Sequence, residues 1–141
     1  MSKEMINETI EQTKVPAFGY ELLREVLLPD VFGKDHAQLM YWSGKQLARK
    51  FPLSSIDEIY SFFHEAGWGN LHMQEEKKYE MIFVLDGEYV MRRCDVNKEA
   101  SFQLEAGFIA EQIQRMKDKT TEAIEETKKK NRVVITVQWD K

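Results

Sequence analysis

A change in hydrophobic period near the middle of the chain constrains the fold more than any other feature. Before the turn at residues 67–69, apolar residues recur every three or four positions, which is the spacing of one helix face. After it, Leu71 and Met73 alternate with polar neighbours, and the run 79–85 is typical of a strand. The last third of the chain repeats this change. The pattern predicts an α+β fold, with helices packed on one face of a twisted antiparallel sheet.

The first predicted helix spans about 17–28, and Pro29 is expected to end it because a proline disfavours the helical conformation in the residue before it. Residues 1–16 show no sustained period and are predicted to be a flexible N-terminal arm, which leaves 17–141 as a single domain. The apolar residues of this helix form a stripe that we expect to face the core. The stripe consists of Phe18, Leu22, Leu23, Val26 and Leu27.

Two further helices are predicted before the sheet. The second spans about 35–51, with Asp35 as its N-cap and Pro52 beyond its end. Gly44 lies in its apolar stripe, where a glycine costs about 1 kcal/mol relative to alanine, so we expect another backbone to approach it closely. The third helix opens with the capping box Ser55 to Glu58, in which a serine and a glutamate satisfy backbone N–H groups of the first turn.

The second half of the chain is predicted to contain two strand pairs around one helix. The pairs cover about 70–85 and 121–139, and the helix covers about 101–117. The segment 88–94 fits either a further strand or a helical turn. The predicted order of elements is therefore ααα-ββ-α-ββ.

Composition and charge argue against several classes of function. The 141 residues are 43% hydrophobic, which is enough for one packed core. A net charge of −4 offers no general attraction to phosphate backbones, so nucleic acid is not an expected partner. No apolar stretch approaches the roughly 20 residues that span a bilayer, and the N-terminal residues lack the pattern of a signal peptide. We therefore expect a cytoplasmic protein without a membrane span.

The sequence contains no recognisable catalytic constellation, so we expect neither an enzyme nor a metal or cofactor. The three histidines lack the spacing of metal ligands. Cys94 follows Arg92 and Arg93, which would activate its thiol if they folded toward it. An enzyme would have to rest on Cys94, His64 and His72.

Acidic residues near a helical apolar stripe also need explanation. Glu105 and Glu111 lie in the predicted helix over 101–117, among apolar neighbours. A carboxylate in such surroundings requires a partner, because burial of an unpaired charge is costly. Glu105 can alternatively flank the core.

Large and adaptable apolar side chains suggest what the protein binds. The sequence has three tryptophans, eight phenylalanines and seven methionines. They favour a non-enzymatic module, either ligand-binding or sensor-like, that holds a small hydrophobic ligand between the helices and the sheet. The alternative is a homodimeric protein–protein interaction scaffold without a ligand, in which apolar faces meet another chain. Under the first hypothesis, the pocket is lined by some of Met40, Phe63, Trp68, Phe83, Phe108 and Ile109.

Several segments resemble known families. The order of elements, with FFHEAGWG (62–69) and FQLEAGFIAEQI (102–113), resembles the four-vinyl-reductase domain and the TRAPP subunits. The segments GYELLREVLLPDVFG, GWGNL, SFQLEAGFIAEQIQ and VVITVQWD look like the YslB-like family, which comprises small uncharacterised proteins of Gram-positive bacteria.

The resemblance implies helices on a twisted sheet, commonly dimeric assembly, and relatives that bind hydrophobic molecules or acyl chains or act as assembly scaffolds. It implies no established activity. Cysteines that occur in the four-vinyl-reductase pattern are missing here, and Cys94 lies in the other half of the domain from the acylated cysteine of one TRAPP branch. Neither a shared metal or thiol function nor lipidation is therefore expected.

Overall fold

A four-stranded antiparallel sheet with the order β1-β2-β4-β3 forms the centre of the computed structural model, which describes residues 14–129 and 131–141. Its strands are β1 (Asn70–Lys77), β2 (Glu80–Asp86), β3 (Thr121–Lys129) and β4 (Arg132–Trp139). Two hairpins supply the strands, and β2 pairs with β4 at the centre, where Phe83 lies opposite Ile135. The predicted α+β class and both strand pairs are confirmed.

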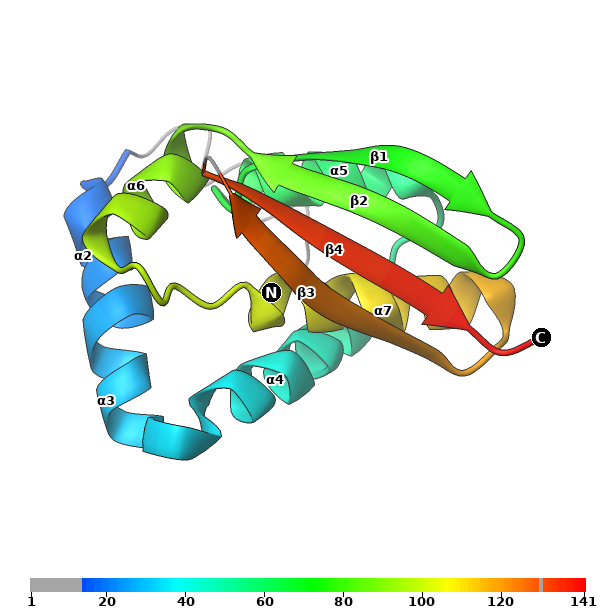
Figure 1. Ribbon diagram of the computed structural model, residues 1–141, viewed down its shortest axis with the longest axis horizontal. Helices are drawn as coiled ribbons and strands as arrows, with labels where there is room; N and C mark the ends of the chain where they lie inside the picture. Colours follow the sequence, from blue (N-terminus) through cyan, green and yellow to red (C-terminus); the bar gives the residue numbers. More distant parts are fainter. Residues whose placement is uncertain (1–13, 130) are drawn as a thin grey trace.

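Three helices lie behind the sheet or beside it (Figure 1). The helices α5 (Ile56–Glu65) and α7 (Gln103–Lys117) contact the sheet, and α4 (His36–Lys50) packs along α7. Alternate residues of β2 and β4 point toward these helices and are buried, as a period of two requires. The buried residues of the two strands on this face are Met81, Phe83, Leu85, Val133, Ile135 and Val137.

Local signals placed most helix boundaries correctly. Ser55 caps α5 by accepting a hydrogen bond of 3.3 Å from the Glu58 N–H, while the Glu58 carboxylate accepts one of 2.6 Å from the Ser54 N–H. The segment whose type was left open forms the helix α6 (Glu88–Val96). Because α6 follows β2 directly, the observed order contains one helix more than the predicted order.

The N-terminal helical segment differs from its prediction. It runs from α2 (Ala17–Glu21) through a π-helix (Leu22–Leu27) into α3 (Leu28–Phe32), and a 3₁₀ turn (Gly33–Asp35) joins it to α4. We call residues 17–32 the N-terminal helix. The prediction that Pro29 ends it is wrong, because the Leu28 N–H bonds to the Leu23 carbonyl five residues back and widens this turn. Pro29 then lies in the first turn of α3, where its missing N–H costs little. Most of the predicted arm 1–16 lies outside the described residues.

The contact between α4 and α7 depends on two glycines. A Cβ atom on Gly44 would overlap the Leu104 carbonyl oxygen, and one on Gly107 would overlap the Tyr41 carbonyl oxygen. The predicted close approach at Gly44 is confirmed, and it brings the backbones of two helices together. This contact holds α4 against α7, while side chains of α4 also reach the edge strand β3.

A tyrosine hydroxyl occupies one outer N–H group on each edge strand. Tyr60 accepts a hydrogen bond of 3.1 Å from the Met73 N–H in β1, and Tyr41 accepts one of 2.9 Å from the Ala123 N–H in β3. Gln114 likewise accepts from the Thr121 N–H at 3.1 Å. Unpaired edge groups favour strand addition by other chains, so these side chains make edge-to-edge association less favourable.

We predict that Gly107→Ala destabilises the protein by about 1–3 kcal/mol, since the added methyl group collides with backbone rather than with an adaptable side chain. The matched control is Gly19→Ala, where no atom lies within 4 Å of the new Cβ atom. It should change stability by less than about 1 kcal/mol. Urea unfolding at one fixed protein concentration measures both, and equal effects would contradict the close contact.

Candidate functional site

The N-terminal helix turns its charged side toward the protein and its apolar side toward solvent. Glu21, Arg24 and Glu25 are buried, with exposed fractions of 6%, 7% and 8%. This is the reverse of the usual arrangement, in which the apolar stripe of a surface helix faces the core. The prediction that this stripe forms part of the core is therefore wrong. Its solvent-facing apolar residues are Phe18, Leu22, Leu23, Val26, Leu27, Val31 and Phe32.

Ion pairs explain the reversed orientation. Glu21 receives two hydrogen bonds from Arg92 of α6, at 2.6 and 3.0 Å. Arg24 binds both carboxylate oxygens of Glu105 in α7, at 2.9 and 3.0 Å. Glu25 pairs with Arg93, which also reaches Glu105 at 3.3 Å.

The carboxylate of Glu105 is the centre of this charge cluster, which we define as Glu21, Arg24, Glu25, Arg92, Arg93 and Glu105. Glu105 is fully buried and is shared by Arg24 and Arg93. The cluster contains three acids and three arginines, so its formal charge is zero. Burial of these charges is tolerable because each one is paired and hydrogen-bonded, and removal of one partner would leave a costly buried charge. The predicted need for a partner is confirmed at Glu105, and also at Glu111, which Arg49 binds at 3.0 Å.

Groups around the cluster have perturbed proton affinities. Burial would by itself lower the pKa of Arg24, but the carboxylate of Glu105 raises it above its ordinary value, so the guanidinium stays charged. Burial also raises the pKa of the Tyr20 hydroxyl, which accepts a hydrogen bond of 3.1 Å from Arg24. Burial and the nearby Arg24 lower the pKa of His36. The two raised pKa values keep the Tyr20 hydroxyl neutral beside the charged guanidinium of Arg24.

The six residues predicted to line a ligand pocket are all buried. Phe63, Trp68, Phe83, Phe108 and Ile109 belong to one hydrophobic cluster. The rings of Trp68 and Phe108 meet edge to face with centroids 5.3 Å apart, as do those of Phe63 and Trp68 at 5.0 Å.

Three pockets formed by described residues lie elsewhere, and their walls include none of these six residues. The largest has a volume of about 330 Å³ and lies between the start of α5 and the end of α7. Ile56, Met81, Ile113 and Met116 supply its apolar wall, while Glu76, Lys117, Ser54 and Ser55 add polar groups.

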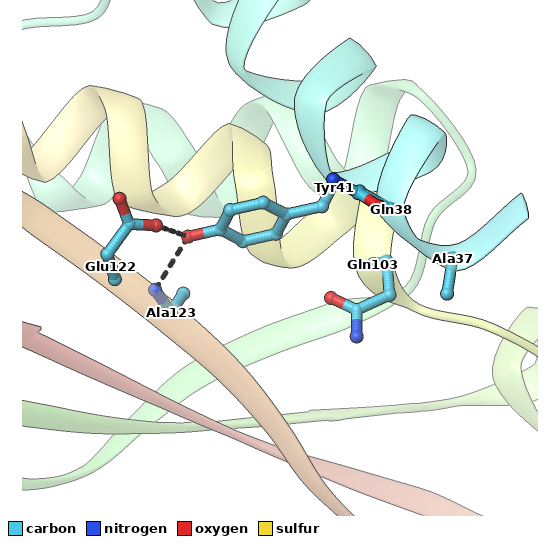
Figure 2. A pocket seen from close by; sticks show the side chains of 6 residues that line it. All are labelled: Ala37, Gln38, Tyr41, Gln103, Glu122 and Ala123. Atoms are coloured by element: carbon cyan, nitrogen blue, oxygen red, sulfur yellow. Dashed lines mark hydrogen bonds between the residues drawn. The ribbon is translucent and has the colours of Figure 1, made fainter. Parts of the chain in front are cut away.

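Figure 2 shows a second pocket, of about 260 Å³, beside the edge strand β3. Tyr41 extends from α4 across this pocket and donates a hydrogen bond to Glu122, which Lys45 also binds at 2.9 and 3.1 Å. Burial and this hydrogen bond raise the pKa of Tyr41. Burial would raise the pKa of Glu122, but Tyr41 and Lys45 bring it below its ordinary value. A neutral tyrosine and a charged carboxylate thus form a fixed structural contact at this strand edge.

The residues that a catalytic site would need, Cys94, His64 and His72, do not lie together. His64 lines a third pocket, of about 180 Å³, with Asn70, Glu88 and Tyr89, whereas His72 is exposed on β1 and is not among its lining residues. Cys94 is half-buried, but Arg92 and Arg93 extend to Glu21 and Glu25. Among residues 14–129 and 131–141, no three histidine, cysteine or acidic side chains are grouped as metal ligands would be.

The sequence holds a signal for the cluster that a search for apolar stripes misses. Glu21, Arg24 and Glu25 have i, i+3, i+4 spacing, so they share one helix face as clearly as the apolar residues share the other. Arg92 and Arg93 supply the complementary charges, but their distance along the chain hides the pairing. Within the described part of the chain, no helix has the length and apolar character needed to cross a bilayer.

Comparisons with known proteins identify relatives of this chain. The model of a family described as "Protein of unknown function (DUF2507)" matches residues 17–138. The uncharacterized protein YslB of Bacillus subtilis (strain 168) is 50% identical over 134 residues, which cover 94% of this chain and 90% of that protein.

Solved structures share the fold at low identity. A vinyl-4-reductase family protein from Methanocaldococcus jannaschii aligns with a TM-score of 0.67 and 18% identity, over 96% of this chain and 88% of its own. An Fe(II) unliganded H-NOX protein from K. algicida aligns with a TM-score of 0.53 and 12% identity, over 99% and 88%. At such identities the likeness shows the fold alone. The family match and the Bacillus relative confirm the expected resemblance, and the chain belongs to the DUF2507 family of YslB-like proteins.

Proposed function

We propose that the protein is a non-enzymatic interaction module that forms a homodimer through the apolar side of its N-terminal helix. The observation that carries this proposal is the row of seven solvent-facing apolar side chains on a helix whose charged side is buried. A contiguous apolar surface of this kind is unfavourable in water and commonly marks an interaction site. The engagement of Arg92 and Arg93 with Glu21 and Glu25 supports a structural role for these arginines over activation of the Cys94 thiol.

The size of this surface fits a stable dimer. The seven side chains keep between 36% and 64% of their surfaces exposed. Together they present roughly 700 Å², close to the ~800 Å² that one partner contributes to an interface of standard size. This area is of the same order as the ~300–600 Å² of the largest apolar patch on a typical monomer, a patch that is often functional.

A second copy of the chain is the occupant that matches this surface best. An apolar stripe along one helix can be self-complementary, because two copies can pair antiparallel about a two-fold axis, each covering the other. The mild negative charge of the chain gives no attraction to an anionic membrane surface, which disfavours a lipid as the occupant.

Substitution of Leu23 by glutamate tests the homodimer. Leu23→Glu places a charge in the centre of the proposed interface, so we expect the dissociation constant of the dimer to rise by about tenfold or more. Ile124→Glu is the control, since Ile124 has nearly the same exposure, 53% against 51%, but lies on β3. Sedimentation equilibrium over a dilution series measures both variants. A wild-type chain that stays monomeric throughout, or equal effects of both variants, would overturn the proposal.

A small hydrophobic ligand is the second candidate, and the pocket of about 330 Å³ favours it because two residues of the core, Met81 and Ile113, form part of its wall. This volume lies within the range of small-molecule sites, roughly 300–1,000 Å³. The six residues predicted to line a ligand pocket remain a second proposed site for the same function. A ligand bound among them would have to open the packing around Trp68.

Native mass spectrometry of protein purified from its own host tests this second function, and a retained molecule is the expected result. Ile56→Trp, which fills the pocket of about 330 Å³, should expel a molecule bound there. Loss of the molecule only in Trp68→Phe would instead locate it among the six core residues. An apo mass, with no thermal stabilisation by a library of lipids and aromatic compounds, would reject the ligand at both places.

A further inference from the structure

The surface beneath the N-terminal helix is charged. It contains Arg92 and Arg93 of α6 and Glu105 of α7, and the last two are 1% and 0% exposed. If the helix rolled its apolar side inward, these groups would lose Glu21, Arg24 and Glu25 as partners. Buried charges without partners are among the most costly features of a folded protein. The charged surface beneath the helix therefore favours burial of the charged side of the helix. The usual hydrophobic preference would bury the apolar side instead.

Several bonds secure this orientation along one stretch of the helix. Glu21 binds Arg92 of α6, and Arg24 binds Glu105 of α7. Glu25 binds Arg93 and accepts a hydrogen bond of 3.3 Å from the Asn97 side chain. The side chains of Arg24 and Arg93 also donate to the Ser101 carbonyl, which precedes α7. The helix is therefore attached to two elements, α6 and the start of α7. Figure 1 shows α6 beside α2.

We infer that Arg93 and Glu105 are positioning residues that hold the N-terminal helix with its apolar side outward, and that they act on dimer formation without touching the partner chain. The inference rests on the proposed homodimer for its last step. Both residues are too deeply buried to enter an interface, so their influence passes through Glu25 and Arg24. The Glu21–Arg92 pair acts in the same way at the rim, where the Arg92 side chain is 48% exposed.

A reciprocal charge exchange at the rim gives the sharpest test, because it spares the buried centre. Glu21→Arg places two arginines together and Arg92→Glu places two glutamates together, so each single variant should loosen the helix. The double variant restores an ion pair in the opposite sense. We expect hydrogen exchange to increase in residues 17–32 in both single variants, with a several-fold weaker dimer, and both measurements to return toward wild type in the double variant.

A matched control pair lies outside the charge cluster, between α4 and α7. Arg49 and Glu111 form an ion pair of 3.0 Å with side-chain exposures of 53% and 12%, close to the 48% and 7% of Arg92 and Glu21. Arg49→Glu should lower stability without changing hydrogen exchange in residues 17–32 or the dimer constant. An equal effect of Arg49→Glu on those two measurements would overturn the inference, because general destabilisation would then suffice.

The conservative variant Glu105→Gln tests the buried centre, since it keeps the shape of the side chain but removes the charge that Arg24 and Arg93 share. We expect faster exchange in residues 17–32 and a weaker dimer. Faster exchange with an unchanged dimer constant would overturn the positioning role and leave the homodimer intact. If the wild-type protein is a monomer and the charge variants still speed hydrogen exchange in residues 17–32, the cluster orients the helix but the proposed homodimer is rejected. Unchanged exchange in every charge variant would overturn the inference outright.

Discussion

The shared carboxylate of Glu105 is the interaction on which the outer architecture depends. It lies at zero exposure between Arg24 and Arg93, and through them it joins the N-terminal helix to α6 and α7. A buried carboxylate must be compensated, and two arginines compensate it only if each finds a further acid or carbonyl group. Glu25 and the Ser101 carbonyl complete that requirement. The helix is held by its charges, so its apolar residues are left to face water.

The remainder of the structure is a packed body in which side chains occupy part of both sheet edges. Gly44 and Gly107 let two helix backbones touch, and side chains from the helices occupy outer N–H groups of both edge strands. Phe108 packs against Trp68 and Phe63 beneath the sheet. Among the residues that the structure describes, the N-terminal helix carries the largest group of exposed apolar side chains, which is why a surface and not the core supports the proposed function best.

Membership of the DUF2507 family places the chain beside a family described as of unknown function and an uncharacterized Bacillus relative. The vinyl-4-reductase family protein and the H-NOX protein share its architecture at 18% and 12% identity. A shared architecture supports many different sites, so a function has to be argued from the side chains present. Here those side chains are a neutral cluster of six charges and the seven apolar residues on the opposite side of the same helix.

The sequence by itself determined the features that depend on neighbours in the chain. The change in the spacing of apolar residues predicted the α+β class, and the capping box at Ser55 predicted the start of α5. Gly44 in an apolar stripe predicted a close contact between two helices. The tertiary structure alone decided the orientation of the N-terminal helix, because its two stripes are equally regular and only partners about 70 to 80 residues away, Arg92, Arg93 and Glu105, distinguish them. The hydrophobic pattern favours burial of the apolar side of this helix. The ion pairs reverse that preference, because leaving buried charges without partners costs more free energy than exposing the apolar surface.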